Sequence, residues 1–485
     1  MVRRSLLAAA TGVLVAGPFV LAFRSGAFFD GPRVVGMVVA WGLVVVVALA
    51  APRPLPRDGA VRAALAGLAL FAAWTTLSGT WSPARDAAVD DAQRLGLYLA
   101  GLVAATALLR PARVLRALEP AALLGILAMT LFGLSDRLLP TLVTLQRHFS
   151  AGSRLEQPLT YWNAMGLVCA TGLVLAARLA GDRSRPDRLR AAAAAAGAPL
   201  GLALYLTFSR GALAAAAAGL VVLLATAPTW SQLRAAGLVL ETGAAAAVVG
   251  SLLPAVVSYD ASQSGREGQA LVMLAALGLL CLAAGAVQGW ACRLERAGAA
   301  RLGSLPLPRR TGWLAGGLVA LALAGFVTAS AREQRGAAPT GATAQRLATL
   351  KSNRYEYWRV AFRVWEDHPL AGTGTAGFRV EWRRRRAISE NVMDAHSLYL
   401  ETAAELGLVG LALLVLTGGG IALAARRALR AAPDAAAGAC AVFVTWAFHT
   451  GIDWDWEMPT VTLIALLFAG ALLALADGAP QRPRT

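Results

Sequence analysis

VVGMVVAWGLVVVVALAA, residues 34–51, is a stretch without a single charged side chain. An α-helix rises about 1.5 Å per residue, so a helix of this length reaches across most of the hydrocarbon core of a bilayer, about 30 Å. A helix that is apolar all round has no face to present to water. These residues therefore predict a membrane-spanning helix.

Similar apolar runs recur along the whole chain of 485 residues. Hydrophobic residues make up 57% and charged residues 15% of it, against about 25% charged in soluble proteins, and the mean hydropathy is +0.58. We predict an all-α polytopic membrane protein with about 12–14 transmembrane helices. The expected spans are 5–23, 34–51, 60–78, 88–109, 117–135, 159–178, 191–208, 211–227, 235–257, 268–290, 311–330, 398–424, 436–452 and 459–476.

The charge of the chain indicates its orientation. It has 45 basic and 28 acidic residues, a net charge of +17, and Lys351 is the only lysine. This arginine bias is typical of a GC-rich genome and does not by itself indicate nucleic-acid binding. If the N-terminus is cytoplasmic, the short inner loops hold roughly two dozen arginines and the short outer loops about eight. We therefore expect both termini inside and an even number of spans.

One long polar segment interrupts the spans. We expect an N-terminal bundle of about 11 helices over 1–330, an extracytoplasmic loop over 331–397 and about 3 C-terminal helices over 398–485. Loops of this size in compact proteins are usually functional or disordered. The loop is therefore the first place to look for a site.

A helix is expected within this loop. In SNRYEYWRVAFRVWEDHP, which ends at Pro369, aromatic residues recur three and four positions apart at Tyr355, Trp358, Phe362 and Trp365, the spacing of an amphipathic helix. Such a helix either lies on the bilayer surface or caps the bundle, or it packs on its own loop. The sequence leaves both alternatives open.

The glycines of GTGTAGF come next. Gly372, Gly374 and Gly377 match the spacing of a dinucleotide-binding turn, but that motif requires a preceding strand, a following helix and a downstream acid in one unit. None of these is predicted, so we reject a dinucleotide site. A tight turn that positions the loop, or that approaches a phosphate, is expected instead.

His396 stands just before the next apolar run. We expect Asp394 to cap a helix that starts at Ala395, which places His396 in the first turn. The positive end of the helix dipole there should keep its ring neutral, as a general base for a hydroxyl requires. The alternative is a histidine that is merely solvated at a helix start.

Two glutamates follow on one face of the same predicted helix. Glu405 lies roughly 13 Å along it from the helix start, which is close to the middle of the membrane. An ionisable side chain at that depth is expected to face a polar cavity or a partner. We therefore expect Glu401 and Glu405 to mark a polar cavity that descends from His396, while Glu241 in the ninth span is buried for no evident reason.

Two further positions carry charge at the predicted outer face. Arg210, in LTFSRGAL, runs against the arginine distribution and indicates either an anion site or an arginine that reaches to the interface. DWDWEMP supplies Asp453, Asp455 and Glu457, with His449 upstream. Such acids can hold a divalent metal, contact a sugar or anchor the interface beside their tryptophans.

Together these motifs resemble a known family. RYEYWRVAFRVWEDHPLAGTGTAGF followed by DAHSLYLETAAELGLVG resembles the signature region of the O-antigen ligase and Wzy-type polymerase superfamily. Weaker agreements, in the family's order, are WSPARDA (81–87), TYWNAMGL (160–167) and TFSRGAL (207–213). The sequence departs from the pattern at Ser397, where the family often has asparagine, and in the arginine block 383–386.

The resemblance implies a C-type glycosyltransferase fold without cofactors. It also implies an inverting, metal-independent transfer of glycan from an undecaprenyl-diphosphate carrier to an acceptor hydroxyl, outside the bacterial cytoplasmic membrane. His396 would deprotonate the acceptor, and Arg210 and Arg354 would bind the diphosphate. Glu405 would orient the site.

Glu401 and Tyr399 are expected to support the same site, and Asp453 and Asp455 to contact the acceptor or a sugar. The acceptor can be lipid A core, a growing glycan or a protein hydroxyl, and the arginine block would suit an anionic acceptor or lipid headgroups. Two other classes stay open. A metal-dependent glycosyltransferase would carry an acidic pair in its first outer loop, where only Asp30 occurs, and a solute transporter would more often show inverted repeats.

Overall fold

The computed structural model describes residues 2–259, 262–297 and 352–479, which form helices and their connecting loops. The α-helices are α1 (Val2–Ala22), α2 (Asp30–Ala50), α3 (Gly59–Ser78), α4 (Arg85–Leu108), α5 (Ala112–Leu138), α6 (Trp162–Gly181), α7 (Asp187–Ala195), α8 (Gly197–Thr207), α9 (Arg210–Thr226), α10 (Trp230–Ser251), α11 (Pro254–Val257), α12 (Gln263–Arg296), α15 (Arg354–Asp367), α16 (Phe378–Arg385), α17 (Leu398–Ala431), α18 (Pro433–His449) and α19 (Pro459–Gly478). Short 3-10 helices are η1 (Ser25–Ala27), η2 (Phe149–Ala151) and η4 (Asp455–Glu457).

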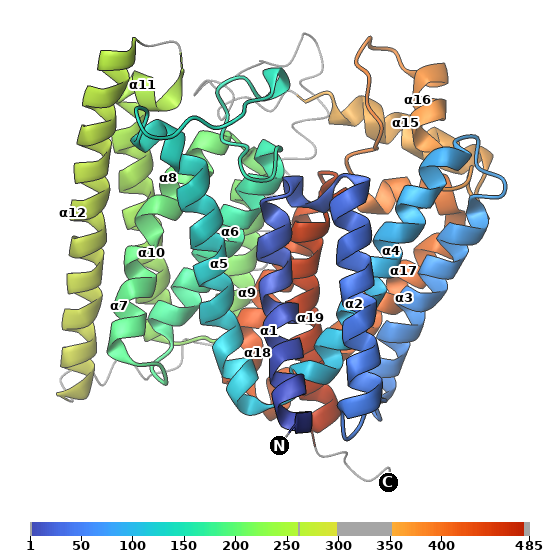
Figure 1. Ribbon diagram of the computed structural model, residues 1–485, viewed down its shortest axis with the longest axis horizontal. Coiled ribbons are helices and arrows are strands. Elements are labelled where there is room, and N and C mark those ends of the chain that lie inside the picture. Colours follow the sequence, from blue (N-terminus) through green and yellow to red (C-terminus); the bar gives the residue numbers. More distant parts are fainter. Residues whose placement is uncertain (1, 260–261, 298–351, 480–485) are drawn as a thin grey trace.

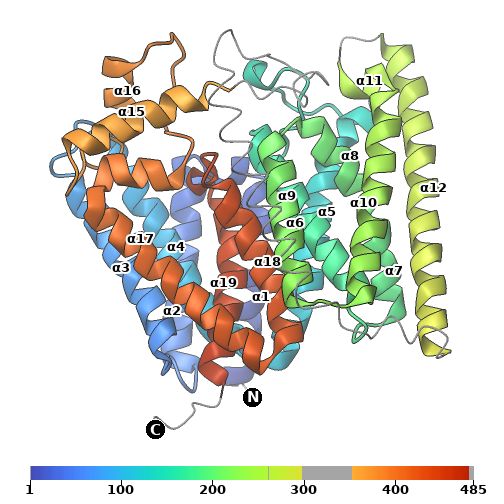
Figure 2. The same cartoon turned by 180° about the vertical axis from the view of Figure 1, so that it is seen from behind.

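The helices form one bundle of membrane-spanning length. Within the described ranges, 10 helices are long and apolar enough to cross a membrane, with α7 and α8 counted as one, and α9 is a shorter apolar helix. α4 and α18 run alongside them (Figures 1 and 2). The prediction of an all-α polytopic membrane protein is confirmed. The span predicted at 311–330 lies outside the described residues, as does the part of the outer loop before residue 352.

The two ends of the bundle differ. α1 begins and α19 ends at the same end, while α15 and α16 stand at the opposite end (Figure 1). This matches the expectation that both termini lie on one side and the charged loop on the other. The division into three regions at 330 and 397 stays a prediction.

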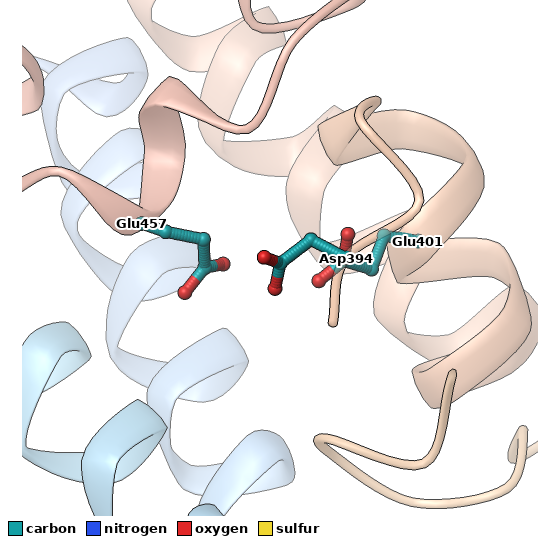
Figure 3. Close-up of side chains that lie close together, drawn as sticks. All are labelled: Asp394, Glu401 and Glu457. Atoms are coloured by element: carbon teal, nitrogen blue, oxygen red, sulfur yellow. The ribbon is translucent and has the colours of Figure 1, made fainter. Parts of the chain in front are cut away.

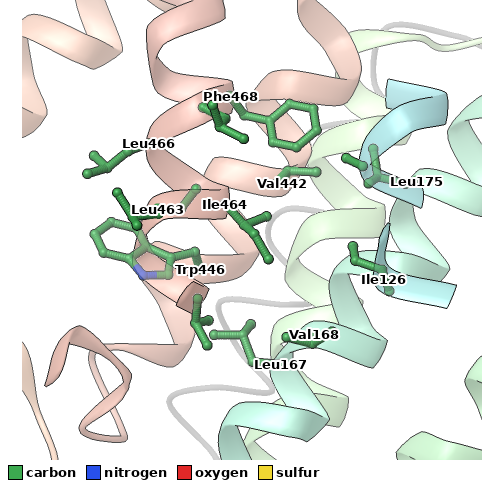
Figure 4. Close-up of a cluster of buried hydrophobic side chains, with 14 of the residues drawn as sticks. Ile126, Leu167, Val168, Leu175, Val442, Trp446, Leu463, Ile464, Leu466 and Phe468 are labelled. Carbon is green, nitrogen blue, oxygen red and sulfur yellow. The ribbon is translucent and has the colours of Figure 1, made fainter. Parts of the chain in front are cut away.

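α19 lies in the interior of the bundle, as does α6. Its apolar window is 94% buried, and Figure 4 shows its side chains meeting those of α5, α6 and α18, with Phe468, Ile464 and Val442 among them. Helices in lipid associate through close packing rather than exclusion of water. Gly470 illustrates this, since a Cβ there would stand 2.4 Å from the Cβ of Ala105 on α4.

The outer helix α15 is confirmed, and its two faces have different surroundings. Tyr357, Val360 and Val364 are buried against α16 and the start of α17. Of the predicted aromatic stripe, Tyr355 and Phe362 are exposed. The helix therefore packs on its own loop with one face and presents part of its aromatic stripe outward with the other.

α17 is not one straight helix. Gly407, with φ 63° and ψ −160°, separates an upper arm that begins at Leu398 from a lower arm that ends at Ala431, and Figure 2 shows the arms running in different directions. Glycine tolerates this left-handed φ because it lacks a Cβ. The break comes two residues after Glu405, so Glu405 belongs to the upper arm, and its depth in the membrane stays a prediction.

The loop after α15 enters the gap in α17. The N–H groups of residues 408–409 donate to the carbonyls of 369–370 at 2.8 and 3.3 Å, and those of 373–374 donate to the carbonyls of 404–405 at 3.1 and 2.8 Å. A helix break in a membrane protein leaves backbone groups that must find partners inside the protein. The outer loop supplies them, so loop and helix form one hydrogen-bonded unit.

Candidate active site

His396 lies just before α17 rather than in its first turn. Its φ is +54°, and the helix starts at Leu398 with Ser397 as its cap, whose Oγ accepts from the N–H of Leu400 at 3.4 Å. Glu401 reaches back to accept from the N–H of Ala395 at 2.8 Å. The prediction that Asp394 caps a helix starting at Ala395 is wrong, because these two side chains satisfy the free N–H groups instead.

Contacts from α15 fix the position of His396. The rings of Tyr357 and His396 have centroids 5.0 Å apart, and Trp358 Nε1 donates to the His396 carbonyl at 3.4 Å. His396 Nδ1 lies 3.1 Å from the backbone oxygen of Asp394. A carbonyl only accepts, so Nδ1 carries the hydrogen, and Nε2 of the neutral ring keeps its lone pair. This arrangement fits a general base.

An ion pair stands beside this histidine. Arg354, at the start of α15, pairs with the fully buried carboxylate of Asp453, in the turn between α18 and α19. Tyr161 donates its hydroxyl to Asp453 Oδ1 at 2.7 Å and accepts from Asn163 Nδ2 at 2.7 Å. These contacts thus connect three segments that are far apart in the sequence: residues 161–163, Arg354 and Asp453.

The charges of this pair act on His396. Burial lowers the pKa of His396, and the Arg354 cation lowers it further, while Asp453 opposes the shift. Burial would raise the pKa of Asp453, but the Arg354 cation lowers it below its usual range. These shifts favour a neutral His396 imidazole next to an ionised Asp453 carboxylate. The expected neutral ring is supported, although its cause is burial rather than a helix dipole.

Carboxylates gather below the histidine. Asp394, Glu401 and Glu457 have oxygens within 4.8 Å of one another, and Figure 3 shows the three side chains converging. Such oxygens can hold a divalent cation. Arg94 of α4 already pairs with Glu457 and with Asp91. Arg94 and these carboxylates together form a charged cluster in which Glu457 is buried and Asp394 and Glu401 are half-buried.

A small polar cavity lies beside this cluster, and Glu401 and Glu405 line it as expected, whereas His396 does not. It has a volume of about 40 Å³ and is lined by Arg94, Glu401 and Glu405, among others, which is room for only a few water molecules. Burial raises the pKa of Glu457 well above its usual range, and nearby Asp394 adds to this against the pull of Arg94. Burial therefore favours the protonated form of Glu457, and Arg94 favours the ionised form.

Glu405 holds the glycine turn. Its two oxygens accept from the backbone N–H groups of Ala376 and Phe378, each at 2.9 Å. Gly372 and Gly374 have φ of 64° and 89°, so the predicted tight turn is confirmed. Successive N–H groups in such turns bind anions. Here the anion is the protein's own carboxylate, which occupies the position a phosphate would take.

The remaining expected site residues are dispersed. Tyr399 donates its hydroxyl to the Ala447 carbonyl at 2.7 Å and so joins α17 to α18. Arg210 is the first residue of α9. Asp455 forms a hydrogen bond with His449. Glu241 on α10 is exposed, so the prediction that Glu241 is buried is wrong.

The arginine block is largely used within its own loop. Arg385 pairs with Asp367 at 2.5 Å and with Glu381 at 2.7 Å, and Arg384 also pairs with Glu381. Arg386 donates to two backbone carbonyls. The pair of Arg385 with Asp367 fastens α16 to the end of α15, while a role of the block in acceptor or headgroup binding stays a prediction.

Sequence reasoning missed the Asp91–Arg94 pair of α4. Asp91 accepts from Thr375 in the glycine turn, and Arg94 reaches Glu457 before α19. The signal was available, because ionisable residues inside an otherwise apolar span (88–109) are costly and mark functional interiors. α4 thereby links the turn to the acidic segment.

A comparison with known families bears on this arrangement. Residues 194–415 match the family model described as O-antigen ligase. This part of the chain is similar to the O-antigen ligase family. The matched range contains Arg210, Arg354 and His396, together with Glu405, and it confirms the resemblance drawn from the sequence. A search of curated proteins found no match.

The O-antigen ligase match defines the role in general terms. The protein acts in cell-surface polysaccharide assembly, a process of glycosyl transfer with lipid-linked glycans and acceptors as partners. Its apolar helices and its family fit a multi-pass protein of the bacterial inner membrane.

Proposed function

We propose that the protein transfers or polymerises glycan from an undecaprenyl-diphosphate carrier onto an acceptor hydroxyl at the outer face of the cytoplasmic membrane. One observation carries this proposal above the others. His396, with the lone pair of Nε2 available, is held by α15 beside the Arg354–Asp453 pair. A base and a cation next to each other are what transfer from a diphosphate requires.

The reaction follows from this pair of groups. Nε2 of His396 takes the proton of the acceptor hydroxyl while its oxygen attacks the anomeric carbon from the face opposite the diphosphate. The bond between that carbon and the phosphate oxygen breaks, and its electron pair leaves with the diphosphate. Configuration at the carbon is inverted.

Arginine can stabilise the leaving group without a metal. Arg354 and Arg210 are proposed to bind the diphosphate through charge-assisted hydrogen bonds, which are stronger than neutral ones. Arg354 is nevertheless paired with Asp453 in the absence of donor. Donor binding would then compete for the guanidinium, and Asp453 would hold it in place between turnovers.

The outward orientation is supported by two independent features. Arginines concentrate in the loops on the side of the termini, and α15 and α16 stand at the opposite end of the bundle (Figure 1). A hydroxyl acceptor outside the cytoplasm would meet His396 there. The supporting roles of Glu401, Glu405 and Tyr399 are structural in this proposal, since each bonds backbone.

The test is transfer by purified protein in liposomes that contain undecaprenyl-diphosphate-linked glycan and an acceptor. His396→Ala should abolish the new glycosidic bond while the protein still inserts and melts as the wild type does. His148→Ala is the matched control, because His148 bonds Glu156 in another loop. Full transfer by His396→Ala would contradict the proposal, and glycan movement without bond formation would indicate a transporter.

A further inference from the structure

An apolar cavity lies between α1, α2, α4 and α19, away from the charged cluster. Its volume is about 340 Å³, which is within the range of small-molecule binding sites in proteins. Every residue that lines it is a glycine, alanine, proline, valine or leucine. This space, the α1–α2 cavity, therefore suits a hydrocarbon ligand.

The α1–α2 cavity is in the outer half of the bundle. Its lining comes from residues 13–21 of α1 and 35–43 of α2, and α1 begins at the end of the bundle opposite to α15 and α16 (Figure 1). Val20 and Val35 line it and are 65% and 62% exposed. The cavity is therefore open to the outer leaflet of the bilayer.

Small side chains leave this space empty of protein atoms. Gly17 and Ala40 line it from α1 and α2, and a Cβ built on Gly17 would meet no described atom within 4 Å. Water in an apolar cavity finds no hydrogen-bond partners, so such cavities stay dry or take an apolar ligand. In a bilayer, the ligand at hand is the chain of a lipid.

The outer end of the cavity adjoins the candidate active site. Beyond Leu21 the backbone passes through η1 to Phe28, whose ring centroid is 5.5 Å from that of Trp454. Trp454 follows Asp453, the partner of Arg354. A lipid with its head at Arg354 and its chain in the outer leaflet would thus have this cavity beside it.

We propose that the α1–α2 cavity binds part of the polyisoprenyl chain of the lipid diphosphate donor. This inference rests on the proposed function, which places the diphosphate at Arg354, and adds a separate site for the chain. The methyl branches of an isoprenyl chain make it bulkier than a straight acyl chain, so a widened space between helices suits it. The protein then recognises the donor by its chain as well as by its charge.

Substitutions that fill the cavity test this assignment. Gly17→Leu and Ala40→Leu place a larger side chain in it from α1 and from α2. Gly12→Leu and Ala48→Leu are the matched controls, because they make the same changes on the same helices at exposed positions outside the cavity. The probe is undecaprenyl diphosphate, binding to the full-length protein in phosphatidylcholine nanodiscs, and the melting temperature checks that each variant is folded.

Binding of the probe should weaken about tenfold in each cavity variant, because the leucine displaces methylene and methyl groups of the chain from a protein contact. Each control should bind within about threefold of the wild type. Equal binding by all variants would show that phospholipid chains fill the cavity and would overturn the proposal. Equal weakening by the controls would overturn it too, as would a wild type that does not bind the probe.

The wild type gives a second test that needs no substitution. A polyisoprenyl diphosphate with a photoreactive diazirine on its chain should crosslink to residues 13–21 or 35–43, and crosslinks confined to other helices would overturn the proposal. Failure of the proposed function would look different. Normal probe binding that is sensitive to Gly17→Leu, in a protein that transfers no glycan, would contradict the proposed function and leave the chain site in place.

Discussion

Arg354 and Asp453 are 99 positions apart in the chain and form an ion pair that joins α15 to the turn between α18 and α19. The Asp453 side chain is fully buried, whereas the Arg354 side chain is 23% exposed. The pair therefore fastens the outer helix to the membrane bundle at the place where His396 stands. Its removal should affect stability and transfer together.

Loss of Arg354 should leave Asp453 as a buried charge without its cation. Arg354→Ala is expected to destabilise the fold by about 3–5 kcal/mol, and Arg354→Ala with Asp453→Ala should recover part of this because both charges are gone. Thermal unfolding in detergent measures both. Arg359→Ala on the same helix is the control, since its partly exposed pair with Glu356 should contribute about 1 kcal/mol or less. A double variant no more stable than the single one would contradict the prediction.

The pH profile of transfer should reflect the environment of His396. A base acts when neutral, that is, above its pKa, and burial with Arg354 lowers the pKa of His396 from its ordinary 6.5. The acid limb of the profile should therefore lie below pH 6.5. Because Asp453 raises the pKa of His396, Asp453→Asn should move the limb to still lower pH. A limb above pH 6.5 in the wild type would exclude His396 as the group observed.

Glu405 should be required for the shape of the glycine turn. Glu405→Gln leaves one oxygen for two N–H groups, so one charge-assisted bond is lost, at a cost of about 1.5–3 kcal/mol. The loss should appear in thermal unfolding as well as in transfer. Glu241→Gln, at an exposed position of α10, should change neither. Equal stability of the two variants would show that the turn does not need the carboxylate.

Gly407 should tolerate no side chain. A Cβ there would stand 2.3 Å from the carbonyl carbon of Leu370 at a φ of +63°, so Gly407→Ala must distort the junction between loop and helix. Strong loss of folded protein is expected in expression and gel-filtration measurements. Gly418→Ala and Gly419→Ala lie in the same helix with open space around them. They should fold as well as the wild type.

Transfer should survive removal of divalent cations. The arginine-based stabilisation proposed for the diphosphate needs no metal, so EDTA treatment followed by metal-free assay should leave the rate within about twofold of its starting value. The cluster of Asp394, Glu401 and Glu457 makes this a real test, since its geometry suits a cation. Loss of transfer on EDTA, restored by one specific metal, would favour a metal-dependent transferase.

The helical membrane fold could be predicted because it depends on local composition. An apolar run such as 34–51 is long enough to span a bilayer whatever its neighbours are. Basic residues in the flanking loops then indicate which end of the span faces the cytoplasm. The path of α17 could not be predicted in this way. Gly407 resembles any glycine in an apolar helix, and only the insertion of residues 369–370 shows why the helix breaks there.

Within the site, single residues were easier to predict than their partners. His396 was identified from its place in a motif, but the residue that caps α17 was not. Asp394 and Ser397 are only three positions apart and both are good capping residues, and the cap is Ser397. Arg94 was missed altogether. Its partner Asp91 lies one turn earlier on α4, but its second partner, Glu457, comes within reach only when the chain folds, and no pattern within one segment predicts that contact.

The break in α17 at Gly407 has a mechanical consequence. The upper arm, from Leu398 to Gly407, is a lever about 13 Å long with His396 at its tip, and backbone bonds to the loop stiffen its corner. Membrane helices tilt when bilayer thickness changes. A tilt of the lower arm by about 5° would move the tip by about 1 Å, and displacements of that size can slow catalysis a hundredfold. Lipid chain length would then set the reaction rate through geometry alone, with no regulator bound.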